Sequence, residues 1–198
     1  MIDTIYLDVD GVLADFAGET LRRYDFDPAD YPRGEYNMSK VLGVTDDDLW
    51  AKLDTFEFWN NLPVLESGKH IFRVVYSMAI THGIPFKILT SYPKDRPEPF
   101  KTARRVWLKK HGYFDLVDKV IFNRDKAQFA TPTSLLIDDN DRNIKLFRNA
   151  GGMTYQIPGY WNQLHELEIT IDMRAEAEIL SRVMNAMYYF TQRKTEIE

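Results

Sequence analysis

Residues 4–16, TIYLDVDGVLADF, join an apolar run to three aspartates that fall within eight positions. The run from Ile5 to Val9 is rich in β-branched and apolar side chains, which predicts a buried strand. Asp8 lies near the end of this run, and Asp10 and Asp15 follow it. Carboxylates at the end of a core strand cost free energy unless a cation, hydrogen-bond donors or water meet them. The stretch therefore predicts a strand whose end faces a binding partner, although Asp10-Gly11 alone is also an ordinary turn dipeptide.

The composition limits the kinds of site that the chain can build. Its 198 residues are 44% apolar, which is enough for one domain, or one domain with a modest insertion, to bury a core. The chain has no cysteine, which excludes disulfides, thiolate zinc sites and a cysteine nucleophile. Any metal must be held by oxygen or imidazole ligands.

Charge and hydropathy favour a small-molecule substrate. The net charge of −5 disfavours binding to a nucleic-acid polymer, although a local basic patch could hold one small phosphorylated ligand. No window approaches the roughly 20 apolar residues of a membrane span, and the N-terminus has no basic segment followed by an apolar one. We expect a cytoplasmic protein that binds neither membranes nor nucleic acid. The oligomeric state stays open, with a homodimer as one option.

Short apolar runs alternate with helical patterns along most of the chain. The runs that predict strands are Ile5 to Val9, Phe86 to Thr90, Val117 to Phe122, Leu135 to Ile137 and Met153 to Ile157. The patterns that predict helices are Lys69 to Thr81, Phe100 to Lys110 and Arg142 to Asn149. Near-continuous apolar strands that alternate with helices predict a parallel α/β sheet covered on both faces.

One segment interrupts this alternation. About fifty residues rich in aromatic and acidic side chains separate the first strand from the helix at Lys69. They predict a small helical insertion above the sheet, with Thr45 as the N-cap of a helix in VTDDDLWAKL, residues 44–53. The C-terminal residues 173–194 carry a stripe of apolar side chains and predict an amphipathic helix packed on the domain.

Polar residues follow the predicted strands where their carboxyl ends meet, the place at which open parallel sheets bind ligands. They are Asp8, Asp10, Thr90, Ser91, Lys126, Asp138 and Asp139. Carboxylates at one edge suit a hard cation, since Mg²⁺ with a substrate phosphate needs only one or two of them plus waters. A lysine and hydroxyl groups can match the charge of a phosphoryl group from other sides. The set predicts phosphoryl-transfer chemistry with Mg²⁺.

The motifs DVDGVLADF, ILTS, RDKA and LLIDD, in this order, resemble those of the haloacid dehalogenase-like phosphatases. More narrowly they are similar to those of the 5'(3')-deoxyribonucleotidases, whose first motif also continues through Ala-Asp-Phe. The resemblance implies a Rossmann-like open parallel sheet with helices on both faces and a small, mostly helical cap inserted after the first strand. We expect a catalytic core at 1–16 and 68–198, and a cap at 17–67.

The resemblance also implies catalytic roles. Asp8 would be the nucleophile that forms an aspartyl-phosphate, and Asp10 would protonate the leaving alkoxide and then deprotonate the attacking water. Thr90 and Ser91 would donate hydrogen bonds to the phosphoryl oxygens, and Lys126 would neutralise charge on the nucleophile and the phosphoryl group. Lys126 lies twelve residues before Asp138, a longer link than expected, so the nearby Lys119 and Arg124 are alternatives.

The Mg²⁺ ligands would be Asp8, the backbone carbonyl of Asp10, and the pair Asp138 and Asp139. The motif leaves open which member of that pair contacts the metal. The same stretch could instead cap the helix that begins near Arg142, for which the neighbouring Asn140 or Asp141 is an equally good cap. We assign Asp15 to a structural role.

The insertion should set substrate choice. By resemblance Phe16 would pack against a nucleobase, and Tyr36 and Trp59 are further candidates for substrate contact. The predicted substrate is a nucleoside 5'-monophosphate, with a deoxyribonucleotide favoured. The alternatives are a phosphatase for another small phosphate, such as a sugar phosphate, and a catalytically silent ligand-binding protein of the same fold.

Overall fold

The structure, a computed structural model, describes residues 2–94, 97–170, 181 and 184–185. Most of the amphipathic helix expected at 173–194 lies outside the described residues. Within the described part of the chain, no helix is long and apolar enough to cross a membrane.

Five parallel strands form one sheet in the order β3-β2-β1-β4-β5. The strands are β1 (Thr4–Leu7), β2 (Phe86–Thr90), β3 (Val120–Phe122), β4 (Ser134–Asp138) and β5 (Met153–Gln156). The first strand lies at the centre, where Ile5 is opposite Phe86 on one side and Leu135 on the other. The predicted parallel α/β sheet is confirmed.

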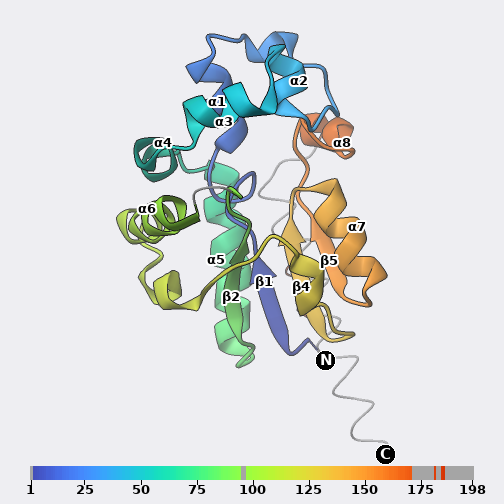
Figure 1. The fold of residues 1–198 in the computed structure, drawn as a ribbon. Helices are drawn as coiled ribbons and strands as arrows, with labels where there is room; N and C mark the ends of the chain where they lie inside the picture. Colours follow the sequence, from blue (N-terminus) through green and yellow to red (C-terminus); the bar gives the residue numbers. More distant parts are fainter. Residues whose placement is uncertain (1, 95–96, 171–180, 182–183, 186–198) are drawn as a thin grey trace, which may run out of the picture.

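Side chains of the central strands alternate between two cores, because successive residues of a strand point to opposite faces. Ile5 and Leu7 pack in the larger core with apolar residues of α5 (Glu66–Thr81) and α6 (Pro97–Lys110). Tyr6 packs in a smaller core with Leu136 and with Phe147 of α7 (Asp141–Asn149). Helices therefore cover both faces of the sheet (Figure 1).

The insertion after β1 is helical, as expected. It contains α1 (Phe16–Arg23), the 3₁₀ turn η1 (Pro28–Asp30), α2 (Met38–Leu42), α3 (Asp46–Leu53) and α4 (Phe56–Asn61). Thr45 caps α3, since its side chain accepts a hydrogen bond from the Asp48 N–H at 3.1 Å. Figure 1 shows α1, α2 and α3 above the carboxyl end of the sheet, so the insertion covers the edge where the polar residues gather.

Element boundaries differ from the sequence pattern in a few places. The predicted third strand begins too early, because residues 117–119 belong to a 3₁₀ segment, η2 (Phe114–Lys119). Leu116 and Val117 are buried there, and buried apolar residues look alike in a strand and in a tight turn. The first strand ends at Leu7, before Asp8. The described chain also contains two short elements, η3 (Lys126–Phe129) and α8 (His165–Thr170).

Candidate active site

The loop after β1 turns sharply and delivers two aspartates to the sheet edge. The backbone oxygen of Val9 accepts hydrogen bonds from the N–H groups of Leu13 and Ala14 at 2.7 and 2.8 Å. Gly11 has a φ of 74°, and a Cβ built there would lie 2.1 Å from Oδ2 of Asp139. Both the left-handed backbone and the close approach of Asp139 require glycine at this position.

Asp8, Asp138 and Asp139 form a buried group that we call the carboxylate cluster. One carboxylate oxygen from each lies within 4.8 Å of the others. The side chain of Lys126 enters the group, with Nζ 2.7 Å from Oδ2 of Asp8 and 2.7 Å from Oδ2 of Asp138. Lys126 contributes these contacts from the start of η3, shortly beyond β3.

The buried charges of the cluster do not balance. Burial raises the pKa of Asp8 to about 7, despite the opposing effect of the Lys126 ammonium. Burial, and then the negative charges of Asp138 and Asp8, raise the pKa of Asp139 well above its ordinary value. Burial would lower the pKa of Lys126, but Asp138 and Asp8 raise it above its ordinary value.

Three carboxylates face one ammonium, so two negative charges remain when all four groups are ionised. A divalent cation with oxygen ligands would neutralise them, and the spacing of the carboxylate oxygens suits several contacts to one ion. The residues present therefore fit the Mg²⁺ ion that the sequence motifs imply.

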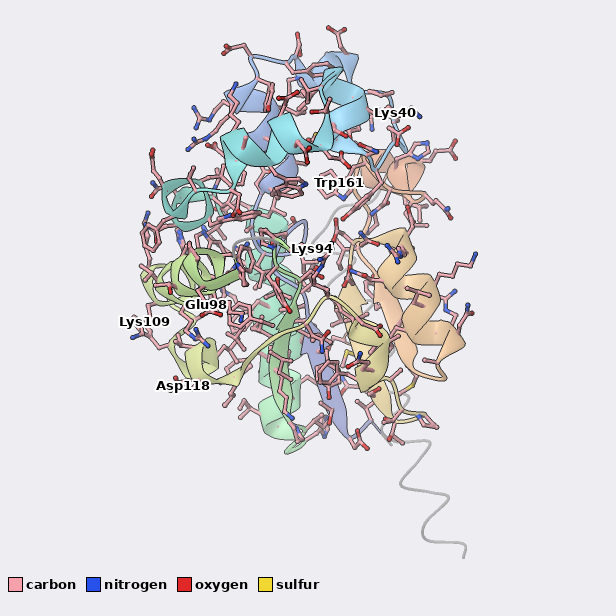
Figure 2. The ribbon with its side chains drawn as sticks, in the orientation of Figure 1. Lys40, Lys94, Glu98, Lys109, Asp118 and Trp161 are labelled. Carbon is pink, nitrogen blue, oxygen red and sulfur yellow. The ribbon has the colours of Figure 1, made fainter. Side chains whose placement is uncertain are left out.

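Amide and indole groups hold the carboxylates in place. Oδ1 of Asp138 accepts hydrogen bonds from the Asn140 N–H at 2.9 Å and from Nδ2 of Asn143 at 3.2 Å. Oδ2 of Asp139 accepts one from Nε1 of Trp161 at 2.6 Å. Trp161 follows β5 and lies between the sheet and the insertion, whereas Lys40, Lys109 and Asp118 lie at the outside of the molecule (Figure 2).

The capping assignments are also resolved. The side chain of Asn140, and not that of Asp138 or Asp139, caps α7 by accepting a hydrogen bond from the Asn143 N–H at 3.0 Å. Asp15 caps α1 by accepting one from the Gly18 N–H at 2.9 Å, which is the structural role expected for it.

Asp10 lies apart from the carboxylate cluster. Nη2 of Arg104 donates to both of its carboxylate oxygens, at 2.6 and 2.7 Å. Arg104 lies on α6 and has no exposed side-chain surface, while the Asp10 side chain is 25% exposed. The backbone carbonyl of Asp10, and not its side chain, was predicted to bind the metal, and this contact stays a prediction.

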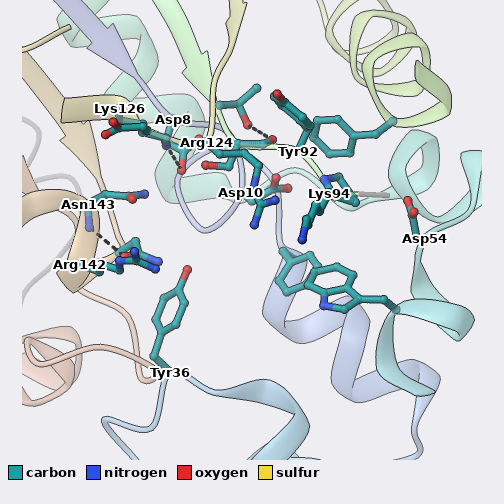
Figure 3. A pocket seen from close by; sticks show the side chains of 18 of the residues that line it. Asp8, Asp10, Tyr36, Asp54, Tyr92, Lys94, Arg124, Lys126, Arg142 and Asn143 are labelled. Carbon is teal, nitrogen blue, oxygen red and sulfur yellow. Dashed lines mark hydrogen bonds and ion pairs between the residues drawn. The ribbon is translucent and has the colours of Figure 1, made fainter. Parts of the chain in front are cut away.

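A cavity of about 1010 Å³ opens above these residues. Asp8, Asp10, Thr90, Ser91 and Lys126 all line it, so the structure brings the predicted catalytic side chains to one wall. Thr90 is almost fully buried. Three further cations that line the cavity, Lys94, Arg124 and Arg142, project into it in Figure 3.

The opposite wall is aromatic and comes from the insertion. Phe16 stacks on Trp59, with ring centroids 5.7 Å apart and 12° between the planes, and on Trp50 at 6.2 Å and 29°. Trp59 is only 3% exposed, whereas Trp50 is 40% exposed. Tyr36 also lines the cavity and points its hydroxyl into it (Figure 3). Trp50 belongs to the aromatic residues of the insertion that the sequence shows, but it was not among the residues predicted to contact the substrate.

Sequence reasoning missed Arg104, Asn143 and Trp161. Trp161 follows a strand at the same edge, so the strand-end rule that found Asp138 could also have found it. Arg104 falls on the apolar face of α6 with Phe100 and Trp107. A charged residue at a core-facing helical position is a signal of a buried ion pair, but the sequence does not identify its partner.

No protein-family model and no curated protein matches the chain. Among solved structures, it is similar to a HAD family hydrolase from Deinococcus radiodurans R1 with bound phosphate and sodium, at 16% identity and a TM-score of 0.53. That match covers 78% of this chain and 80% of the other. It is also similar to CbbY from Rhodobacter sphaeroides in complex with phosphate, at 16% identity and a TM-score of 0.50, over 82% of this chain and 89% of the other. The chain therefore has the fold of the haloacid dehalogenase-like (HAD) hydrolases.

Proposed function

We propose that this chain, which has the HAD hydrolase fold, is a Mg²⁺-dependent phosphatase that acts through an aspartyl-phosphate on Asp8. The observation that carries the proposal is the position of Asp8. It contacts the Lys126 ammonium and lies beside two further buried carboxylates, at the wall of a cavity large enough for a nucleotide. The two similar structures named above both contain phosphate, which accords with the proposal.

In the proposed reaction, a carboxylate oxygen of Asp8 forms a bond to phosphorus while the ester bond from phosphorus to the substrate oxygen breaks. Asp10 gives a proton to the departing alkoxide. Asp10 then accepts a proton from the water that attacks phosphorus, which releases inorganic phosphate and restores Asp8. The proton that Asp10 gives in the first step is replaced by the one that it accepts from water in the second step.

The other side chains bind and orient the phosphoryl group. Lys126 contacts Asp8 and Asp138 and so keeps positive charge beside the nucleophile. Thr90 and Ser91 offer hydroxyl donors from the end of β2. A Mg²⁺ ion held by Asp8, Asp138 or Asp139 and the Asp10 carbonyl would supply further positive charge to the phosphoryl oxygens.

The proposed substrate is a nucleoside 5'-monophosphate, with a deoxyribonucleotide favoured. Support comes from the aromatic wall, where Phe16 and the exposed ring of Trp50 provide a surface on which a base could stack.

The test is phosphate release from ribo- and deoxyribonucleoside monophosphates and from sugar phosphates, each with Mg²⁺ and with EDTA. We expect Mg²⁺-dependent release that is fastest for nucleotides. Release that does not need a metal, or none from any monophosphate, contradicts the proposed chemistry. Faster release from sugar phosphates contradicts only the nucleotide assignment.

Trp50→Ala tests the aromatic wall. Because stacking of a base on an aromatic side chain is worth about 1–3 kcal/mol, the variant should lose about 10-fold in kcat/KM for nucleotides. Its rate on glycerol phosphate, which has no ring, should not change. Phe56→Ala is the matched control, since Phe56 is an exposed aromatic of the insertion that does not line the cavity. Equal effects of both variants on nucleotide turnover would remove Trp50 from the substrate site.

A further inference from the structure

Arg104 is a buried cation that lies among three aromatic rings. Its guanidinium carbon lies 5.6, 5.1 and 5.6 Å from the ring centroids of Trp59, Phe100 and Trp107. Within the described part of the chain, the Nε and Nη1 atoms of Arg104 have no hydrogen-bond partner. The charged contact of this side chain is the one that Nη2 makes with both oxygens of Asp10.

This arrangement is costly for a purely structural residue. A buried guanidinium with two unpartnered nitrogens loses hydration that the aromatic rings only partly replace. An apolar side chain of similar length would fill the same space without that cost, and replacing both members of a buried ion pair by apolar side chains is often neutral or stabilising. The residue type at position 104 is therefore better explained by its contact with Asp10 than by packing.

The same contact restrains the direction of Asp10. If the Asp10 carboxyl group rotated away, Nη2 of Arg104 would also remain buried without a hydrogen-bond acceptor, which is strongly unfavourable. Asp10 is at once held on one side by Arg104 and exposed to the cavity on the other. Arg104 is itself fixed by Trp59 of the insertion and by Phe100 and Trp107 of α6, so its own position is well determined.

We propose that Arg104 is the positioning residue for Asp10, holding the carboxylate toward the substrate ester oxygen at the cavity wall. The proposal rests on the proposed phosphatase function. It also links the insertion to the catalytic wall, because Trp59 contacts both Phe16 in the aromatic wall and the guanidinium of Arg104.

The test compares Arg104→Met with the wild type on two substrates. A deoxyribonucleoside 5'-monophosphate releases an alkoxide that needs a proton, whereas 4-nitrophenyl phosphate releases a stabilised phenolate that needs none. kcat/KM is compared, since it reports the steps up to departure of the leaving group. Misplacing Asp10 should lower kcat/KM for the nucleotide by about 10²-fold and for the aryl phosphate by only a few-fold. Arg105→Met, at an exposed position on the same helix outside the cavity lining, should behave as the wild type on both.

A double-mutant cycle tests whether Arg104 acts through Asp10. In an Asp10→Asn background, Arg104→Met should cause little further loss of nucleotide turnover, because the group that it positions is already disabled. Circular dichroism and thermal unfolding check that each variant is folded.

The proposal is overturned if Arg104→Met lowers kcat/KM equally for the two substrates. It is also overturned if the loss that Arg104→Met causes adds fully to the loss that Asp10→Asn causes. A wild-type protein that is inactive on every phosphate contradicts the proposed function itself, which separates the two failures. If only the nucleotide is turned over, the double-mutant cycle alone decides.

Discussion

Lys126 is the side chain on which the electrostatics of the site depend. It is nearly fully buried and contacts Asp8 and Asp138, and a buried ammonium is stable only with such partners. Without it, the carboxylate cluster would hold like charges in an environment that screens them poorly.

Lys126→Gln should therefore destabilise the metal-free protein. Removing one member of a buried ion pair costs about 3–5 kcal/mol, because the remaining charges stay buried and unpaired. Urea unfolding in EDTA measures the free energy of unfolding. Lys94→Gln is the control, since Lys94 is an exposed cation of the same cavity, and it should change that free energy by no more than about 0.5 kcal/mol. Similar values for the two variants would show that Lys126 is not needed to stabilise the cluster.

The loop after β1 is the element that joins the nucleophile to the rest of the site. Gly11 lets this loop turn with a positive φ and lets Asp139 approach the backbone. The turn thereby brings the loop after the first strand against the residue that follows the fourth strand, and these two strands are neighbours in the sheet.

Gly11→Ala should disrupt the site through a steric clash with Asp139, in addition to the strain that any side chain causes at a positive φ. Its Cβ would meet Asp139 at 2.1 Å, whereas at Gly43, which also has a positive φ, nothing lies within 4 Å of the added atom. Both substitutions should cost about 1–2 kcal/mol from backbone strain. Only Gly11→Ala should also abolish the rise in melting temperature that Mg²⁺ causes in the wild type. A Mg²⁺ response retained in Gly11→Ala would mean that the approach of Asp139 does not matter for the metal.

The elements also explain which parts of the site can be read from the sequence. Asp8, Thr90 and Asp138 could be found because parallel strands bring their carboxyl ends to one edge, whatever the details of packing. Arg104 and the exposed ring of Trp50 could not be found in this way. Their positions depend on how α6 and the insertion pack against each other, which no local pattern in the sequence specifies. The predicted start of β3 was wrong because burial alone does not distinguish a strand from a 3₁₀ segment.

The molecule as a whole combines a sheet edge with a helical cover. The sheet supplies the carboxylate cluster, and the insertion supplies the aromatic wall, so the cavity lies where the two meet (Figure 1, Figure 3). This division predicts that metal binding belongs to the sheet edge and that substrate preference belongs to the insertion.

Mg²⁺ should stabilise the folded protein through the carboxylate cluster. At a concentration of 100 times Kd, a ligand that binds only the folded state adds about 2.7 kcal/mol, which for a chain of this length raises Tm by about 5–10 °C. Asp139→Asn should lose most of this shift and should raise Tm in EDTA, because it removes one of the repelling buried charges. Asp47→Asn, a change in a carboxylate that lines the cavity from the insertion, should keep the Mg²⁺ shift. Equal Mg²⁺ shifts in both variants would contradict a metal site at the cluster.

The most direct test of the account is the rate of phosphate release by Asp8→Asn and by wild-type protein, measured side by side with Mg²⁺ on the best nucleotide substrate. The substitution keeps the shape of the side chain but removes the nucleophilic carboxylate. We expect Asp8→Asn to release phosphate on the order of 10³-fold more slowly, or slower still, with the folded state retained. Equal rates for the two proteins would contradict the role of Asp8 and, with it, the proposed reaction.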